Sequence, residues 1–233
     1  MQKKKTESNF KFIIELVVLF AVVFAATTAL MTFVISKDRV SGPSMQPGLQ
    51  NNDRLFSLRM KTPKRGDIVV LYAPDAVSES YLTKNNATAK DVTTKNGNLY
   101  LKGKLVPLKD HELYIKRVIG VAGDTVSAKN NQVYLNGKKL KESYLKPAFE
   151  KKEMKEYATA YGLNYKDMKF TSDFNLATQK STMRKTVPKN SYFVMGDNRF
   201  VSHDGRAFGF IGRKNIQSVV VWRYWPLNKM KIF

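Results

Sequence analysis

The chain has 233 residues, of which 43% are hydrophobic and 12% aromatic, and this composition excludes a globally disordered protein. It contains no cysteine and two histidines, which excludes disulfides, cysteine nucleophiles and thiolate or histidine-rich metal sites. The formal net charge of +21 favours contact with nucleic acid, anionic lipid or an acidic wall polymer, although a solvated basic surface explains the same charge.

A long apolar run occupies residues 12–36, and its only charged residue is Glu15. The uncharged part, residues 16–36, is close to the roughly 20 residues that a helix needs to cross a bilayer. A cleavable signal peptide has a shorter apolar core of about 7–15 residues. The run therefore predicts an uncleaved membrane anchor.

The orientation of this anchor is less clearly encoded. The tail at residues 1–11 is rich in lysine, but basic residues also follow the apolar run. Because long domains cross the membrane largely regardless of their charge, we expect a cytoplasmic tail at 1–11 and an extracytoplasmic domain at 37–233.

After the anchor, short β-type runs dominate, and Gly, Asn, Asp and Pro separate them. This pattern predicts a mainly β protein, with an antiparallel sheet as its catalytic or binding domain. The expected strands lie within residues 54–60, 66–73, 98–108, 112–121, 124–128, 131–140, 191–197 and 218–227.

Two segments differ from this strand series. Residues 74–98 are polar and predict a long loop or a mobile hairpin. Residues 142–187 include the best soluble helix candidate, at 148–163, and we interpret this segment as an α/β insertion into the β domain.

A stiff turn, "SGPSMQPGL" at residues 41–49, places Ser44 between two prolines just beyond the anchor. A serine becomes an effective nucleophile only when a neighbouring base removes its proton. One candidate base is His203, but the adjacent Asp204 would point to the opposite face of a strand.

The second candidate base is Lys116, within the apolar run "YIKRVIGV". Burial can lower the pKa of a lysine far enough for its neutral amine to act as a general base. The ordinary alternative is a lysine whose stem packs while its ammonium reaches water.

Four blocks occur in order after the anchor: "SGPSMQPGL", "KRGDIVV" at 64–70, "YIKRVIGVAGD" at 114–124 and "GDNRFVSHDGR" at 196–206. Together they resemble the bacterial type I signal peptidases, membrane-bound serine proteases that remove signal peptides from exported preproteins. The resemblance covers the anchor and the β domain, and only 74–98 and 142–187 lie outside it.

The resemblance implies a role for each matching position. Ser44 would be the nucleophile and Lys116 its general base. Ser202 would hydrogen-bond the lysine and orient it, and Asp204 and Arg206 would form an ion pair that braces the loop. We expect no metal or cofactor.

The sequence also departs from the family pattern. The oxyanion would be bound by the Ser44 N–H, which some members assist with a hydroxyl two residues earlier, where this chain has Gly42. Loss of one oxyanion donor can cost about 2.7–4 kcal/mol. Gly48 and Ala122 stand where the family usually has threonine and proline, which puts local rigidity in doubt.

By resemblance, the substrate would add as an extended strand beside the strand that carries Lys116. Pockets for small side chains, normally alanine at the first and third positions before the cut, would then be lined by five residues, each of which is also a plausible core residue. They are Val40, Met45, Leu49, Tyr114 and Ile115.

Two other functions compete with this interpretation. A self-cleaving repressor of the SOS type shares a serine/lysine dyad but needs a DNA-binding module, whereas this chain has a membrane span; we expect no nucleic-acid partner. A membrane-anchored basic protein that binds acidic wall polymers explains the charge of +21 but leaves Lys116 and the 196–206 block without a role.

Overall fold

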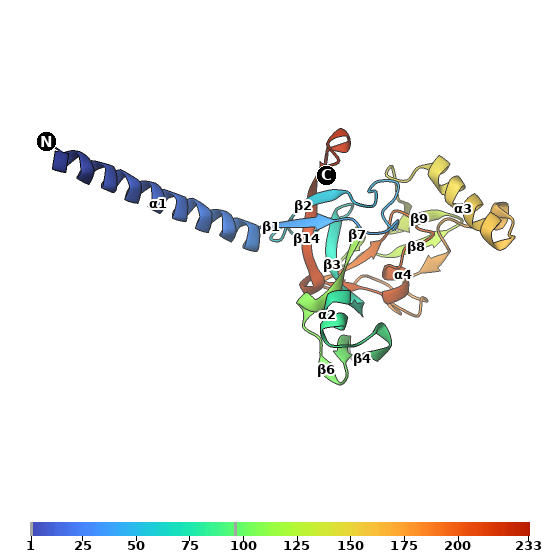
Figure 1. Cartoon of the computed structure of the whole chain (residues 1–233). Coiled ribbons are helices and arrows are strands. Elements are labelled where there is room, and N and C mark those ends of the chain that lie inside the picture. The colour runs from blue at the N-terminus through green and yellow to red at the C-terminus, as the bar shows by residue number, and fades with distance from the viewer. Residues whose placement is uncertain (1, 96) are drawn as a thin grey trace.

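The computed structural model describes residues 2–95 and 97–233, with side-chain positions from residue 10 onward. Helix α1 (Gln2–Phe33) projects away from the rest of the protein (Figure 1). Its segment Phe10–Phe33 is long and apolar enough to cross a membrane, and none of its most apolar stretch is buried. At 1.5 Å per residue these 24 residues extend about 36 Å, which exceeds the roughly 30 Å of a hydrocarbon core.

The helix ends earlier than the expected boundary at residue 36. Ile35 and Ser36 already belong to the first strand, β1, where they pair with Leu58 and Ser57. The apolar pattern alone did not separate the last helical turn from this strand because the apolar run continues through Val34 and Ile35.

The main sheet is antiparallel throughout, which confirms the predicted fold class. Its strand order is β1-β2-β14-β3-β7-β12-β13, and β15 pairs with β14. The strands are β1 (Ile35–Arg39), β2 (Arg54–Leu58), β3 (Ile68–Val77), β7 (His111–Val121), β12 (Ser191–Met195), β13 (Ile211–Gly212), β14 (Ile216–Trp225) and β15 (Lys231–Ile232).

Strand β3 is buried on both faces. Val69 and Leu71 pack into one apolar cluster with residues of β7, β12 and β14. Ile68 and Val70 pack into a second cluster on the opposite face, which also contains residues of the segment between β1 and β2. Burial of each large apolar side chain contributes about 1.5–3 kcal/mol, so this second cluster holds the 40–53 segment firmly against the sheet.

Residues 74–95 fold into regular elements, so the expectation of a long loop is wrong. The segment continues β3 to Val77 and adds a short helix and one strand, which joins two strands that follow it in a three-stranded sheet at the bottom of Figure 1. Its apolar core draws on Leu99, Leu101 and Val106, which follow the polar stretch. These elements are α2 (Glu79–Lys84), β4 (Val92–Lys95), β5 (Asn98–Leu101) and β6 (Lys104–Leu105).

A second small sheet, of order β10-β9-β8-β11, carries the segment 142–187. The predicted helix is present as α3 (Pro147–Tyr161) and ends at Gly162, whose φ of 66° is the left-handed conformation that favours glycine. The strands are β8 (Val126–Lys129), β9 (Gln132–Leu135), β10 (Lys138–Lys139) and β11 (Phe174–Asn175).

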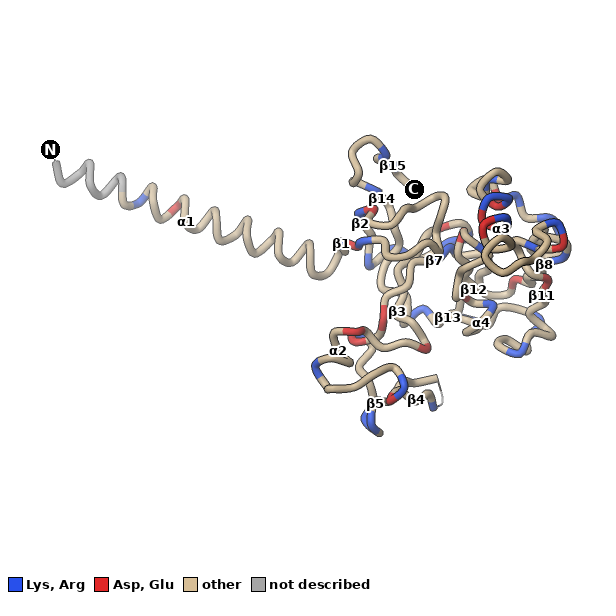
Figure 2. The backbone as a smooth tube through the Cα atoms, turned by 45° about the vertical axis from the view of Figure 1, so that its right-hand side comes forward, with Lys and Arg blue, Asp and Glu red and all other residues tan. Residues whose placement is uncertain are grey.

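The remaining elements are short. Helix α4 (Gly205–Phe208) follows the 196–206 block, and five 3-10 turns join other elements. These turns are η1 (Ala89–Asp91), η2 (Leu108–Asp110), η3 (Tyr165–Asp167), η4 (Arg213–Asn215) and η5 (Leu227–Lys229). Basic residues are distributed over many elements of the globular part, whereas the described residues of α1 carry few charges (Figure 2).

Candidate active site

Ser44 lies in the turn between β1 and β2 and is half-buried. The turn is closed by a bond from the Gln46 N–H to the Pro43 carbonyl at 3.0 Å. The next residue, Met45, is 1% exposed and lies in the apolar cluster shared with β3. A buried anchor directly after the serine therefore fixes where its hydroxyl points.

Lys116 meets this hydroxyl from β7. Its Nζ donates a hydrogen bond to Ser44 Oγ at 2.9 Å, and the residue is 4% exposed. Burial lowers the pKa of Lys116 from 10.5 to about 8; Asp204 and Asp197 act against this shift, and Arg206 adds to it. The structure thus brings together the two residues that the sequence nominated as nucleophile and base.

The 196–206 loop lies over this pair and is braced by Asp204 and Arg206. The Arg206 Nε donates to Asp204 Oδ1 at 2.9 Å, and the Gly196 N–H donates to Asp204 Oδ2 at 2.9 Å. Burial raises the pKa of Asp204, but the hydrogen bonds and charge of Arg206, together with the bond from Gly196, outweigh it, so the pKa is lowered. The expected ion pair is present.

Ser202 comes close to the site without the expected bond. Its Oγ is buried and has no hydrogen-bond partner among the residues that the structure describes, so the predicted bond to Lys116 is not formed. A Cβ built on Gly196 would lie 2.2 Å from Ser202 Oγ and 2.5 Å from the Ser44 carbonyl oxygen. Sequence reasoning missed Gly196, whose lack of a side chain lets the loop approach the nucleophile.

His203 is not placed to act as a base for Ser44. It is exposed, and its Nε2 lies 2.5 Å from Asp75 Oδ2. Asp204, the carboxylate that would orient such a histidine, is bound to Arg206 instead. The geometry favours the lysine alternative.

A cleft of about 200 Å³ opens at the dyad, between residues 37–41 on one side and 113–116 on the other. Four of the five expected pocket residues line it: Val40, Met45, Tyr114 and Ile115. The fifth, Leu49, is fully buried and packs in the cluster beneath the cleft. For Leu49, core packing describes the position better than substrate contact.

The strand edges beside this cleft are open. Strand β7 pairs with β3 from Leu113 to Arg117, but its pairing with β12 begins only at Arg117. Residues 113–116 therefore have a strand neighbour on one side only within the described part of the chain. An extended peptide can pair with such an edge.

The departures at Gly42 and Gly48 have local physical reasons. Gly42 has a φ of +81°, which side chains rarely adopt, and its N–H donates to Asn51 Oδ1 at 3.2 Å. A Cβ at Gly48 would lie 3.2 Å from a carboxylate oxygen of Asp197. Ala122 is exposed in a turn after β7 and lies outside the cleft.

The backbone N–H of Ser44 donates to no acceptor among the described residues. Over the same part of the chain, no group of three or more His, Cys, Asp or Glu side chains is arranged to hold a metal ion. The groups that the described residues bring together beside the cleft are a hydroxyl, a buried amine and a main-chain N–H.

The family model described as "Signal peptidase, peptidase S26" matches residues 13–225. The chain belongs to this signal peptidase family. It is 31% identical over 228 residues to signal peptidase IB of Staphylococcus aureus strain COL, which covers 95% of this chain and 94% of that protein. It is 30% identical over 212 residues to signal peptidase I of Bacillus caldolyticus, covering 89% of each chain.

A solved signal peptidase I from Enterococcus faecalis is 29% identical and covers 68% of this chain and 97% of that one, with a TM-score of 0.44. Family membership and the apolar helix α1 together make this signal peptidase a membrane-anchored peptidase. The family was predicted from the ordered sequence blocks and is confirmed.

Proposed function

We propose that this signal peptidase removes signal peptides from exported preproteins with a Ser44–Lys116 dyad. The observation that carries the proposal is the 2.9 Å hydrogen bond between the buried Lys116 Nζ and Ser44 Oγ. With a pKa of about 8, roughly a tenth of the Lys116 side chains are neutral at pH 7, against about 0.03% for a lysine at its ordinary value of 10.5. Burial therefore raises the population of competent base about 300-fold.

The reaction follows from this geometry. The neutral amine accepts the Ser44 proton as Oγ attacks the scissile carbonyl carbon, and the resulting ammonium then protonates the departing amine. This leaves an acyl ester on Ser44. Lys116, neutral again, deprotonates a water molecule that hydrolyses the ester and releases Ser44 with its proton restored.

The tetrahedral intermediates carry a negative oxygen, and the free N–H of Ser44 is the donor for it. Gly42 contributes no hydroxyl, and its own N–H is already bound to Asn51. We infer that this enzyme operates with one main-chain donor, assisted by water at the open side of the cleft.

The substrate would pair with the open edge of β7 at residues 113–116. Main-chain hydrogen bonds supply affinity along this edge, and side chains alternate between the cleft and solvent. The cleft of about 200 Å³ suits small side chains, and Val40, Met45, Tyr114 and Ile115 would contact them.

We further propose that the tail at 1–11 is cytoplasmic and that residues 37–233 act at the outer face of the membrane. Ser44 lies 11 positions after Phe33, the last residue of α1, so its Cα is within about 36–40 Å of the helix end. A preprotein whose signal peptide sits in the same bilayer presents its cleavage site at a comparable shallow depth. Confinement of both to one membrane raises their effective concentration.

The deciding experiment measures cleavage of a preprotein by the full-length enzyme in detergent. Ser44→Ala and Lys116→Ala should each lower kcat by at least about 10³-fold, because each removes an obligatory reactant. His203→Ala is the matched control and should retain activity, since its imidazole contacts Asp75 rather than the dyad. Inactivation by His203→Ala would overturn the assignment of the base.

The same assay tests the non-catalytic alternative. A basic anchor protein for acidic wall polymers would retain polymer binding in the wild type and cleave no preprotein. That outcome would reject the dyad and leave the charge of +21 as the chain's main functional feature.

A further inference from the structure

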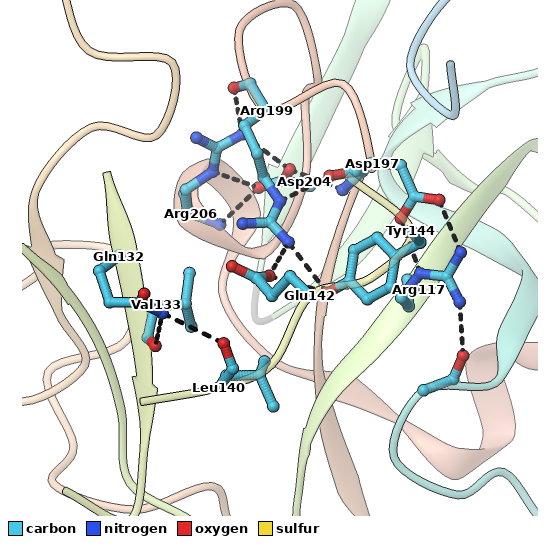
Figure 3. Close-up of polar contacts among 12 residues, drawn as sticks. Arg117, Gln132, Val133, Leu140, Glu142, Tyr144, Asp197, Arg199, Asp204 and Arg206 are labelled. Atoms are coloured by element: carbon cyan, nitrogen blue, oxygen red, sulfur yellow. Dashed lines mark hydrogen bonds and ion pairs between the residues drawn. The ribbon is translucent and has the colours of Figure 1, made fainter. Parts of the chain in front are cut away.

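The guanidinium of Arg199, in the 196–206 loop, is completely buried. Its ion-pair partner is Glu142, which lies outside that loop. The guanidinium donates to Glu142 Oε1 and to Tyr144 Oη, the latter at 3.1 Å, while the Tyr144 hydroxyl donates to Glu142 at 2.8 Å (Figure 3). Glu142 and Tyr144 lie between β10 and α3, in the segment that carried no family motif. This segment therefore supplies the counter-charge for the loop.

The ring of Tyr144 also reaches the strand that carries the base. The guanidinium of Arg117, the residue after Lys116, lies over this ring at 4.0 Å from its centroid. Arg117 in turn forms two hydrogen bonds with Asp197, at 2.7 and 2.6 Å, at the start of the loop. One aromatic side chain thus contacts the arginine beside the base and the arginine within the loop.

Short hydrogen bonds connect Arg199 and its neighbour Asn198 to residues around the proposed dyad. Its Nε donates to the Gly196 carbonyl at 2.9 Å, and its own carbonyl accepts from Arg206 at 2.7 Å. The preceding residue, Asn198, donates its N–H to the Ser44 carbonyl at 3.0 Å. A displacement of Arg199 therefore moves groups on both sides of the dyad.

We propose that Glu142 and Tyr144 are positioning residues for catalysis, which hold the 196–206 loop against Ser44 and Lys116. The inference rests on the proposed dyad. In this arrangement the loop excludes water from the Lys116 amine and holds the unpartnered Ser202 hydroxyl against Gly196.

The charges that surround Arg199 and Lys116 predict how the loss of the Glu142 charge should affect catalysis. Glu142, Tyr144, Glu150 and Asp197 face Arg199. Removal of the Glu142 charge leaves a buried arginine under-compensated, and the loop relieves this by moving toward water. The charged and polar groups that face Lys116 are Ser44, Tyr114, Asp197, Asp204 and Arg206.

If the loop moves away from Lys116, water reaches the amine and the pKa of Lys116 rises toward its ordinary value. The test compares Glu142→Gln and Tyr144→Phe with Glu156→Gln, a control on α3 whose exposed carboxylate only pairs with Lys152 at 3.6 Å. The readouts are kcat and KM for a preprotein across about pH 6–10, with the full chain in detergent.

We expect Glu142→Gln to lower kcat about 10–100-fold while KM stays within about 3-fold of the wild-type value. The acid limb of the pH–rate profile should move to higher pH. Tyr144→Phe should act in the same direction but more weakly, because it keeps the ring against Arg117 and loses only the hydroxyl. Glu156→Gln should match the wild type.

A double variant, Glu142→Gln with Arg199→Met, separates positioning from plain stabilisation. It removes both buried charges, so thermal stability should recover while kcat stays low, because the Arg199 bond to Gly196 is also gone. Recovery of kcat together with stability, or an unmoved acid limb in Glu142→Gln, overturns the proposal. If Glu142→Gln does not fold, an unchanged kcat and acid limb in Tyr144→Phe overturn it equally.

These outcomes differ from a failure of the dyad itself. If Ser44→Ala or Lys116→Ala retains cleavage, the proposed function is wrong whatever Glu142 does. If both lose cleavage and Glu142→Gln keeps a wild-type profile, the positioning role alone is rejected.

Discussion

The backbone N–H of Asn198 donates a hydrogen bond to the carbonyl oxygen of Ser44 at 3.0 Å. The 196–206 loop is thereby joined to the nucleophile through main chain, independently of side-chain identity at either position. The bond fixes the peptide plane after Ser44, while the Ser44 N–H in the preceding plane stays free. This relationship explains why small backbone changes in the loop should affect catalysis.

Gly196→Ala tests that dependence. Its new Cβ would lie 2.2 Å from Ser202 Oγ and 2.5 Å from the Ser44 carbonyl oxygen, and a backbone atom cannot move aside cheaply. We expect the rate of preprotein cleavage to fall at least about 10-fold, equivalent to about 1.4 kcal/mol. Gly103→Ala, at a remote turn with open space, is the control and should lower stability while leaving the rate unchanged.

The substitution Gly42→Ser tests whether a hydroxyl at this position would stabilise the oxyanion. The space around Gly42 is open, but its φ of +81° strains any side chain by about 1–2 kcal/mol. We therefore expect Gly42→Ser and Gly42→Ala to lower kcat to a similar extent. A kcat for Gly42→Ser above that of the wild type would show that the missing donor limits this enzyme.

Sequence patterns predicted those parts of the molecule that depend on local signals. The apolar run predicted the N-terminal helix, β-branched runs predicted the strands around Val69 and Val219, and the helix predicted in the insertion is present as α3. The four ordered blocks nominated Ser44 and Lys116, which the structure places 2.9 Å apart. For these features, neighbouring residues carry enough information.

The wrong or missing predictions concern contacts between distant segments. Apolar residues of the polar stretch 74–95 pack against Leu99 and Leu101, which follow it and complete a small core. Arg199 pairs with Glu142 across 57 positions, and no local pattern encodes such a partner. Arg199 stands in the mostly polar block "GDNRFVSHDGR", which gives no indication of its counter-charge.

Chelation should leave this peptidase active. The proposed dyad would take both nucleophile and base from side chains, and the described residues contain no cluster of three metal-ligating groups. We expect cleavage to be unchanged after exhaustive treatment with EDTA and dialysis, measured against an untreated sample. Complete inactivation that is reversed by one added metal would contradict the mechanism.

Lys116→Met should stabilise the protein while abolishing cleavage. Burial lowers the pKa of Lys116 from 10.5 to about 8, so below about pH 8 the folded state holds an ammonium that it solvates poorly. Between these values the unfolded chain binds more protons, and stability rises with pH. Below pH 8, burial of the ammonium therefore lowers the free energy of unfolding by about 3 kcal/mol. A methionine side chain, which has a similar length and no charge, removes this loss. The Tm of Lys116→Met should exceed that of the wild type at pH 7, by a margin that shrinks toward pH 10.5; a lower Tm at pH 7 would show that the amine is well solvated.

Acid should inhibit the enzyme through the same group. Only the neutral amine of Lys116 accepts the Ser44 proton, and with a pKa of about 8 its neutral fraction falls from about a half at pH 8 to about 1% at pH 6. The value of kcat/KM should therefore fall about 50-fold over this range, with a limiting tenfold change per pH unit. His203→Ala serves as the control, because its imidazole pairs with Asp75 and should not set this limb. A kcat/KM that stays constant down to about pH 5 would exclude Lys116 as the base, since an ammonium has no lone pair with which to take the proton.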